Sequence, residues 1–204
     1  MFVCVVLLFI ISGCSGEQDK KLVKEILVHR AEADSAFRHD PTSPFNRDST
    51  LHYDGIKWFP PDVRYYFASK LFRYADPETV IIFGTKGEER NHLKYGYFKF
   101  LFRAKEYRLN VYKFTATDPE RYKLYKNYLS VWFTDETTGK ETYHVGRYVD
   151  VGEENSDTNF LYTLNLNHAY NPYCAYSNLY SCAIPRKEDH LDFPVRAGEL
   201  KYHK

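Results

Sequence analysis

Two cysteines in the C-terminal third of the chain are the residues best suited to covalent chemistry. Cys174 and Cys182 are separated by seven residues. In an oxidising compartment such a pair favours a disulfide. A catalytic thiolate instead needs a lowered pKa and a base in contact, which makes Cys174 a candidate nucleophile supported only by nearby polar residues. Free structural thiols are the third interpretation.

Metal and nucleic-acid chemistry find little support in the sequence. His168 and His190 could complete a tetrahedral Cys₂His₂ set with the two cysteines, but the spacing lacks the Cys-x₂₋₄-Cys rhythm of a structural zinc site. Phosphate-binding, serine-hydrolase and zinc-protease motifs are absent from the sequence. The 28 basic and 27 acidic residues are spread evenly, so no basic face is expected for nucleic acid. We therefore expect no metal, no cofactor and no nucleic-acid partner.

Arg147 is the charged residue whose surroundings most need an explanation. On a predicted strand over residues 142–149 it points the same way as Tyr143 and otherwise apolar side chains. An arginine on such a face must be paired or must reach solvent at an edge. One interpretation is a guanidinium that binds a carboxylate or phosphate, with Tyr143 donating beside it. The other is an ion pair with Asp135 or Glu141 that braces the hairpin.

The N-terminus predicts export and a membrane anchor. The first sixteen residues carry no charge, and their apolar run ends at Ile11-Ser12-Gly13-Cys14. The run is too short for a membrane-spanning helix and has the layout of a signal peptide, although it lacks the usual basic start. The tetrapeptide resembles the lipobox of bacterial lipoproteins. That resemblance implies removal of residues 1–13, lipidation of Cys14 and a domain outside the cytoplasm in the bacterial cell envelope, with Ser15 favouring the outer membrane. A plain secretory signal or an uncleaved apolar segment are the alternatives.

The elements that must position these residues begin with a helix. Residues 14–21 are predicted to be a lipidated cysteine followed by a polar tether, and residues 22–204 a single domain. Apolar residues at helical spacing from Leu22 to Phe37 predict an amphipathic helix that ends near Asp40, before Pro41.

The rest of the chain alternates with the period of β-strands. Aromatic residues make up 18% of the sequence, a composition that suits strands and that sugar-binding surfaces also use. A capping box predicts a short helix over 118–126. The predicted strands span 64–72, 80–85, 98–103, 109–111, 129–133, 142–149 and 159–167. The fold class is α+β and mainly antiparallel: a sheet, open barrel or sandwich with an N-terminal helix and a long ordered loop over His168–His190.

Several words of the sequence are similar to one family. FTDETTGKETYHVGRYVDV (133–151), HAYNPYCAYSNLYSCAIP (168–185) and VRAGE (195–199) resemble the bacterial and archaeal domain of unknown function 1684 family, over roughly residues 25–200. The resemblance implies no activity. Asn165-Leu166-Asn167 stands where the family tends to have Asp-Phe-Asn, which argues against a reaction that needs that carboxylate.

The slightly favoured function is a lipid-anchored module that binds a small anionic or sugar-like ligand beneath the 168–190 loop. Trp58-Phe59 before Pro60-Pro61 could add an aromatic wall. The alternatives are a hydrolase using Cys174 or the Arg147/Tyr143 cluster, and a structural or interaction lipoprotein without a small-molecule site. The candidate ligand contacts are Tyr143, Arg147, Asn165, Asn167, Asn171, Tyr173 and Tyr176.

Overall fold

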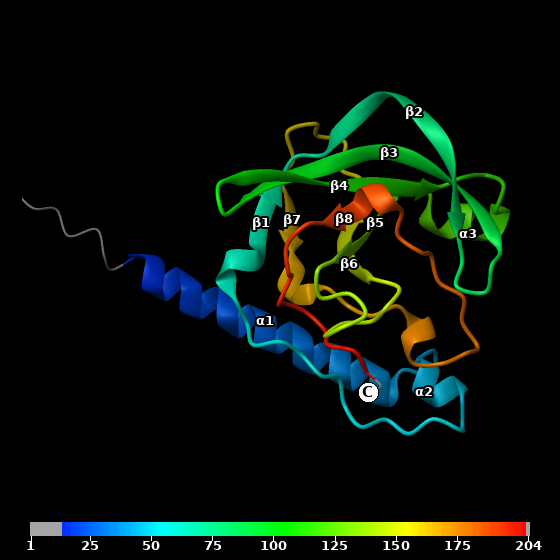
Figure 1. Cartoon of the computed structure of the whole chain (residues 1–204), viewed down its shortest axis with the longest axis horizontal. Coiled ribbons are helices and arrows are strands. Elements are labelled where there is room, and N and C mark those ends of the chain that lie inside the picture. The colour runs from blue at the N-terminus through cyan, green and yellow to red at the C-terminus, as the bar shows by residue number, and fades with distance from the viewer. Residues whose placement is uncertain (1–13, 203–204) are drawn as a thin grey trace, which may run out of the picture.

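A strongly curved antiparallel sheet forms the body of the fold (Figure 1). Its strands lie in the order β2–β3–β4–β5–β6, the short β8 pairs in parallel with β5, and β1 and β7 form a separate two-stranded sheet.

The structure is a computed structural model and describes residues 14–202. The α+β, mainly antiparallel class is confirmed. The strands span Tyr66–Ser69 (β1), Phe72–Phe83 (β2), Glu89–Phe102 (β3), Lys105–Phe114 (β4), Tyr128–Asp135 (β5), Arg147–Glu153 (β6), Tyr162–Asn165 (β7) and His190–Leu191 (β8).

The N-terminal helix is longer than predicted. α1 spans Cys14–His39 and is followed by the one-turn α2 (Pro44–Arg47). Residues 14–21, predicted to be a tether, form its first two turns, because polar residues without proline can continue a helix that needs no buried face there. The body of the protein contacts α1 from Leu22 onward, and Ile26 is fully buried. The predicted signal peptide lies outside the described residues. Within those residues, no helix has the length and apolar character to cross a membrane.

The local predictions succeed where turns and caps are strong. β3 and β4, which contain the predicted strands 98–103 and 109–111, form a hairpin whose turn lies at Arg103–Ala104, both with positive φ. α3 spans Pro119–Tyr125, and the side chain of Asp118 caps it by accepting from the Arg121 N–H.

The predicted strand bounds differ from the observed ones along most of the sheet, and two of the differences affect the candidate site. β6 begins at Arg147, paired with Phe133 of β5, so Tyr143 lies in the preceding turns and not on the same strand. β7 ends at Asn165 and continues as the 3₁₀ helix η2 (Leu166–His168), which breaks the predicted alternation and buries both Asn165 and Asn167.

The two faces of the sheet pack against different parts of the protein. Leu129, Val131 and Phe133 alternate inward, into a core shared with β3, β4, β7 and the C-terminal segment. Ser130 and Trp132 alternate outward, to the face on which α1 and the 168–190 loop lie. The inner face therefore supplies stability, and the outer face is free to form a site.

Candidate functional site

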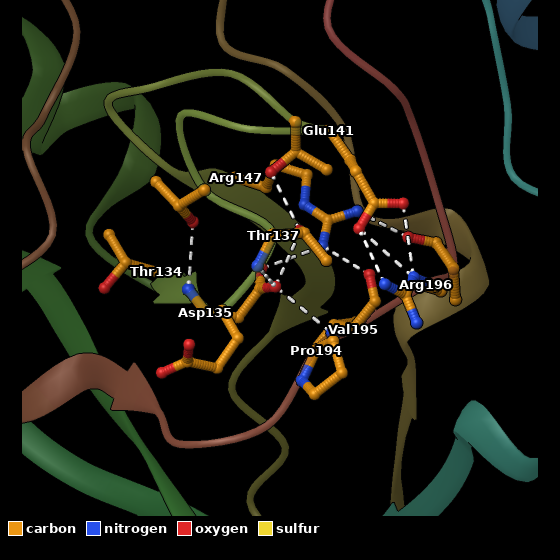
Figure 2. A network of polar contacts seen from close by, with 12 residues as sticks. Thr134, Asp135, Thr137, Glu141, Arg147, Pro194, Val195 and Arg196 are labelled. Atoms are coloured by element: carbon orange, nitrogen blue, oxygen red, sulfur yellow. Dashed lines mark hydrogen bonds and ion pairs between the residues drawn. The ribbon is translucent and has the colours of Figure 1, made fainter.

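Arg147, the first predicted ligand contact, is a fully buried structural residue. Its guanidinium donates to Asp135 Oδ2 at 2.9 Å and to the carbonyl of Val195 at 2.8 Å. It also donates to the carbonyls of Ala197 and Glu199. Figure 2 shows the network of polar contacts around Arg147, Asp135 and Val195. Burial lowers the pKa of Arg147, and the opposing charge of Asp135 raises it. This side chain faces protein on all sides, so it braces the fold and does not meet a ligand.

Asp135 is hydrogen-bonded through both of its carboxylate oxygens. Its Oδ1 accepts from the Thr137 N–H at 2.8 Å, the Thr137 hydroxyl at 2.6 Å and the Val195 N–H at 3.1 Å. Gly146 precedes Arg147 at a φ of 122°, where a Cβ would lie 2.6 Å from the Phe133 carbonyl. The words TDET, GRY and VRAGE thus meet around one buried ion pair, which assigns them a structural role.

The three predicted asparagines are also buried. Asn167 holds the backbone of Asp62 from both sides, accepting from its N–H and donating to its carbonyl, each at 2.8 Å. Asn171 donates from Nδ2 to the Leu200 carbonyl at 2.8 Å. Asn165 accepts from the N–H and Nδ2 of Asn167, and its own Nδ2 lies 3.2 Å from His168 Nε2. With its oxygen thus occupied, Asn165 donates to His168 and places the proton of the neutral imidazole on Nδ1.

The main cavity lies on the outer face of the sheet. Its floor is an unbroken run of rings: His92 packs edge-on against Trp132 at 5.3 Å, and Trp132 lies 5.8 Å from Tyr148. Tyr148 in turn contacts Tyr170, the first tyrosine of the long loop, at 5.8 Å. Trp132 and His92 are 5% and 2% exposed, so these rings form a rigid base.

α1 and the 168–190 loop wall this cavity, which we call the aromatic cleft. His29, Ala33 and Phe37 line it from α1, and Tyr173 and Tyr180 line it from the loop. Its volume is about 640 Å³, within the range of small-molecule sites. The buried hydroxyl of Tyr180 has no hydrogen-bond partner among the described residues. The cleft therefore offers flat apolar surfaces and one unpaired polar group.

The charge balance of the cleft is set by burial. Burial lowers the pKa of His92, and it lowers that of His168 to about 4, so both rings are neutral at pH 7. Burial raises the pKa of Glu199 to about 7, against hydrogen bonds from the Tyr176 hydroxyl and the Asn171 N–H. Arg121 of α3 stands on the rim, with its side chain 42% exposed and 3.6 Å from Asp118. Arg121, paired with Asp118, therefore borders the cleft, and Asp40 and Arg90 are further charged residues that line it.

A second cavity of about 590 Å³ lies on the other side of the loop. Tyr143, Cys174 and Tyr176 line it, so three predicted site residues do meet here. Cys174 and Cys182 are free thiols in the structure, with the Cys174 N–H donating to Cys182 Sγ at 3.2 Å. The predicted disulfide is not formed, although the residues are adjacent. A smaller cavity of about 330 Å³ is lined by Asn165 and His168.

The zinc alternative and the aromatic wall can also be placed. Within residues 14–202, no cluster of three or more histidine, cysteine or acidic residues could hold a metal. His190 instead contacts Thr134 and Glu136. Trp58 lines the aromatic cleft, whereas Phe59 does not.

The aromatic residues at the base of the cleft were not predicted from the sequence. Trp132 was recognisable, because it is the outward residue between two inward ones on a predicted strand. His92, Tyr148 and Glu199 carry no comparable signal, since each reaches the cleft only through the tertiary fold.

The comparisons with known proteins agree with the fold and name no activity. A family model described as protein of unknown function (DUF1684) matches residues 51–200. An uncharacterised protein of Haloarcula marismortui, solved by NMR in solution, is 28% identical, with a TM-score of 0.63 over 90% of this chain and 96% of that one. No curated protein matches the chain.

Proposed function

The chain belongs to the DUF1684 family of proteins of unknown function, and we propose a function for it from its structure. We propose that it is a module that binds a small, flat-faced ligand in the aromatic cleft. The observation that carries the proposal is the cleft itself: about 640 Å³ bounded by aromatic rings, with the unpaired Tyr180 hydroxyl in its wall. A sugar ring or an aromatic molecule would stack on Trp132 and Tyr148. An anionic group on the ligand would meet Arg121 at the rim, and not the buried Arg147.

A dye that combines aromatic rings with an anionic group tests this proposal. We expect the full chain at pH 7 to bind 1-anilinonaphthalene-8-sulfonate saturably. Ala33→Phe fills the cleft from α1 and should weaken binding about tenfold or more, the loss expected when a well-packed contact is blocked. Ala31→Phe is the matched control, because Ala31 is exposed on the same helix and does not line the cleft.

The outcomes separate the ligand classes. Displacement of the dye by aryl glycosides would favour the sugar class, and displacement by aryl carboxylates the anionic class. Equal affinity of the two phenylalanine variants would refute the cleft as the site, and would leave the structural or interaction lipoprotein as the better interpretation.

We further propose that the protein works in the bacterial cell envelope, anchored by lipid on Cys14. The support is the lipobox-like Ile11-Ser12-Gly13-Cys14 at the end of an uncharged apolar run. Two or more acyl chains would hold the protein at the membrane stably. In a bacterial host, the full chain should incorporate labelled palmitate and sediment with membranes, whereas Cys14→Ser should lose both properties. Labelling that survives this substitution would contradict the anchor.

A further inference from the structure

The two thiols lie between the two large cavities, and their surroundings differ. Cys174 lines the 590 Å³ pocket, and Cys182 lines the aromatic cleft behind it. The Tyr143 hydroxyl points at the Cys174 residue, 3.7 Å from its sulfur and 3.3 Å from its carbonyl. The Cys182 N–H donates to the Thr85 hydroxyl at 3.2 Å, which fixes that end of the pair to the loop after β2. The loop thus holds two adjacent sulfurs in separate environments.

These contacts favour the thiolate form of Cys174 and the thiol form of Cys182. The hydrogen bond from the Cys182 thiol, helped by that from Tyr143, lowers the pKa of Cys174. The same contact, together with burial, raises the pKa of Cys182. A purely structural pair has no need of this asymmetry, whereas thiol–disulfide exchange requires one attacking thiolate and one thiol held in reserve.

We propose that Cys174 and Cys182 form a thiol–disulfide exchange site that acts on a low-molecular-weight disulfide entering the pocket at Cys174. The pocket has room for such a molecule, and His144, Asn178 and Lys201 line it with polar groups. The proposal is independent of ligand binding in the aromatic cleft, because the attacking sulfur faces the other cavity.

The exchange proceeds in two balanced steps. The Cys174 thiolate attacks one sulfur of the disulfide R–S–S–R; a bond forms between them, the R–S–S–R bond breaks, and one R–S⁻ leaves with the electron pair and takes up a proton. Cys182 then gives up its proton and attacks Cys174 Sγ, forming the Cys174–Cys182 disulfide and releasing the second R–S⁻, which is protonated in turn. The protein loses two hydrogens and the substrate disulfide is reduced to two thiols.

Oxidised glutathione is a suitable probe, with the full chain carrying Cys4→Ser and Cys14→Ser so that only the pair can react. Purified in reductant and freed of it, this protein should release two glutathione molecules and become lighter by two hydrogens. With Cys182→Ser added, Cys174 should instead retain one glutathionyl group. With Cys174→Ser added, the rate at which Cys182 reacts should fall at least about tenfold, because Cys182 is held as the thiol.

The pH dependence of the rate distinguishes a tuned site from two ordinary thiols. With both cysteines of the pair in place, the release of the first glutathione should reach half its maximal rate at a pH below the pKa of free cysteine, and Tyr143→Phe should move this midpoint upward. Tyr202→Phe is the control, because Tyr202 lines the same pocket but its hydroxyl donates to the His52 carbonyl.

Two results would overturn the proposal. One is a pair that forms its disulfide and then resists reduction by glutathione, which is the behaviour of a structural bond. The other is a midpoint equal to that of free cysteine. Circular dichroism checks that the variants are folded, and the two-hydrogen loss of the unsubstituted pair does not depend on any variant at these positions.

Discussion

Asp135 is the residue that allows a whole positive charge to be buried in this fold. It neutralises Arg147 at 2.9 Å, and both side chains are almost fully excluded from solvent. Three carbonyls complete the environment of the guanidinium. Breaking a buried pair from one side leaves the other charge without compensation, which costs far more than the pair itself contributes.

Asp135→Asn should therefore lower the free energy of unfolding by about 3–5 kcal/mol. The measurement is the shift of the denaturant midpoint at constant slope. Glu141→Gln is the matched control, since it weakens the exposed pair with Arg196 and should change stability by less than about 1 kcal/mol. Equal destabilisation by the two amides would show that Arg147 is not held as described.

Among the elements, the contact between α1 and η2 brings together groups that respond to pH. The His29 ring of α1 meets the His168 ring edge-on, with centroids 3.8 Å apart. Arg30 lies 4.9 Å over the ring of Trp58 and donates to the Phe59 carbonyl at 2.9 Å. Two imidazoles and a guanidinium thus meet in one seam, where a further proton would be costly.

The contact between α1 and η2 predicts that the folded protein loses stability as the pH falls. Burial, with His29 and Arg30 nearby, lowers the pKa of His168 from 6.5 to about 4. As the pH falls through this window, the unfolded chain takes up a proton that the folded chain refuses, so stability decreases. The contribution of His168 is roughly 2–3 kcal/mol after allowance for its partial exposure.

Comparison with His168→Gln isolates this contribution. Between about pH 7 and about pH 4.5 the parent protein should lose more stability than the variant by that amount. Glu199 acts oppositely, because its raised pKa of about 7 favours the folded state as the pH falls, but it is common to both proteins. Glu32 and Asp150, whose charges raise the pKa of His29, are also present in both the parent protein and the variant. An NMR titration of His168 near 6.5 would contradict the prediction.

Local sequence signals predicted elements well where a few residues decide the outcome. Periodicity was enough for the body of α1 and for strands in β3 and β4, and a capping box was enough for α3. It failed where tertiary contacts decide: η2 turns out of β7 because Asn167 must reach Asp62, far away in the chain. The start of α1 was missed because exposed polar residues give no apolar period to read.

At the scale of the whole molecule, the candidate site was predictable only in fragments. The long loop was correctly singled out, and Tyr143, Cys174 and Tyr176 do line one pocket. The aromatic cleft, however, combines α1, α3, the four strands β3 to β6, the loop and residue 199, which no spacing along the chain connects. Arg147 and Asp135 were named as possible partners, but the carbonyls that complete their site come from about fifty residues further on.

The C-terminal segment has a consequence for how the chain is made. Its carbonyls receive Arg147, the Gly198 carbonyl accepts from the Phe59 N–H at 3.0 Å, and the Leu200 N–H donates to Lys57 at 2.9 Å. Gly198, at a φ of 78°, passes so close to Ala169 that a Cβ would lie 2.4 Å from its carbonyl. Residues 195–200 thus lie between residues 57–59 and residues 147–169 of the chain. Hairpins can form early in synthesis, but the core closes only after residues 195–200 have been made, so a product that stops before them should remain open to proteases.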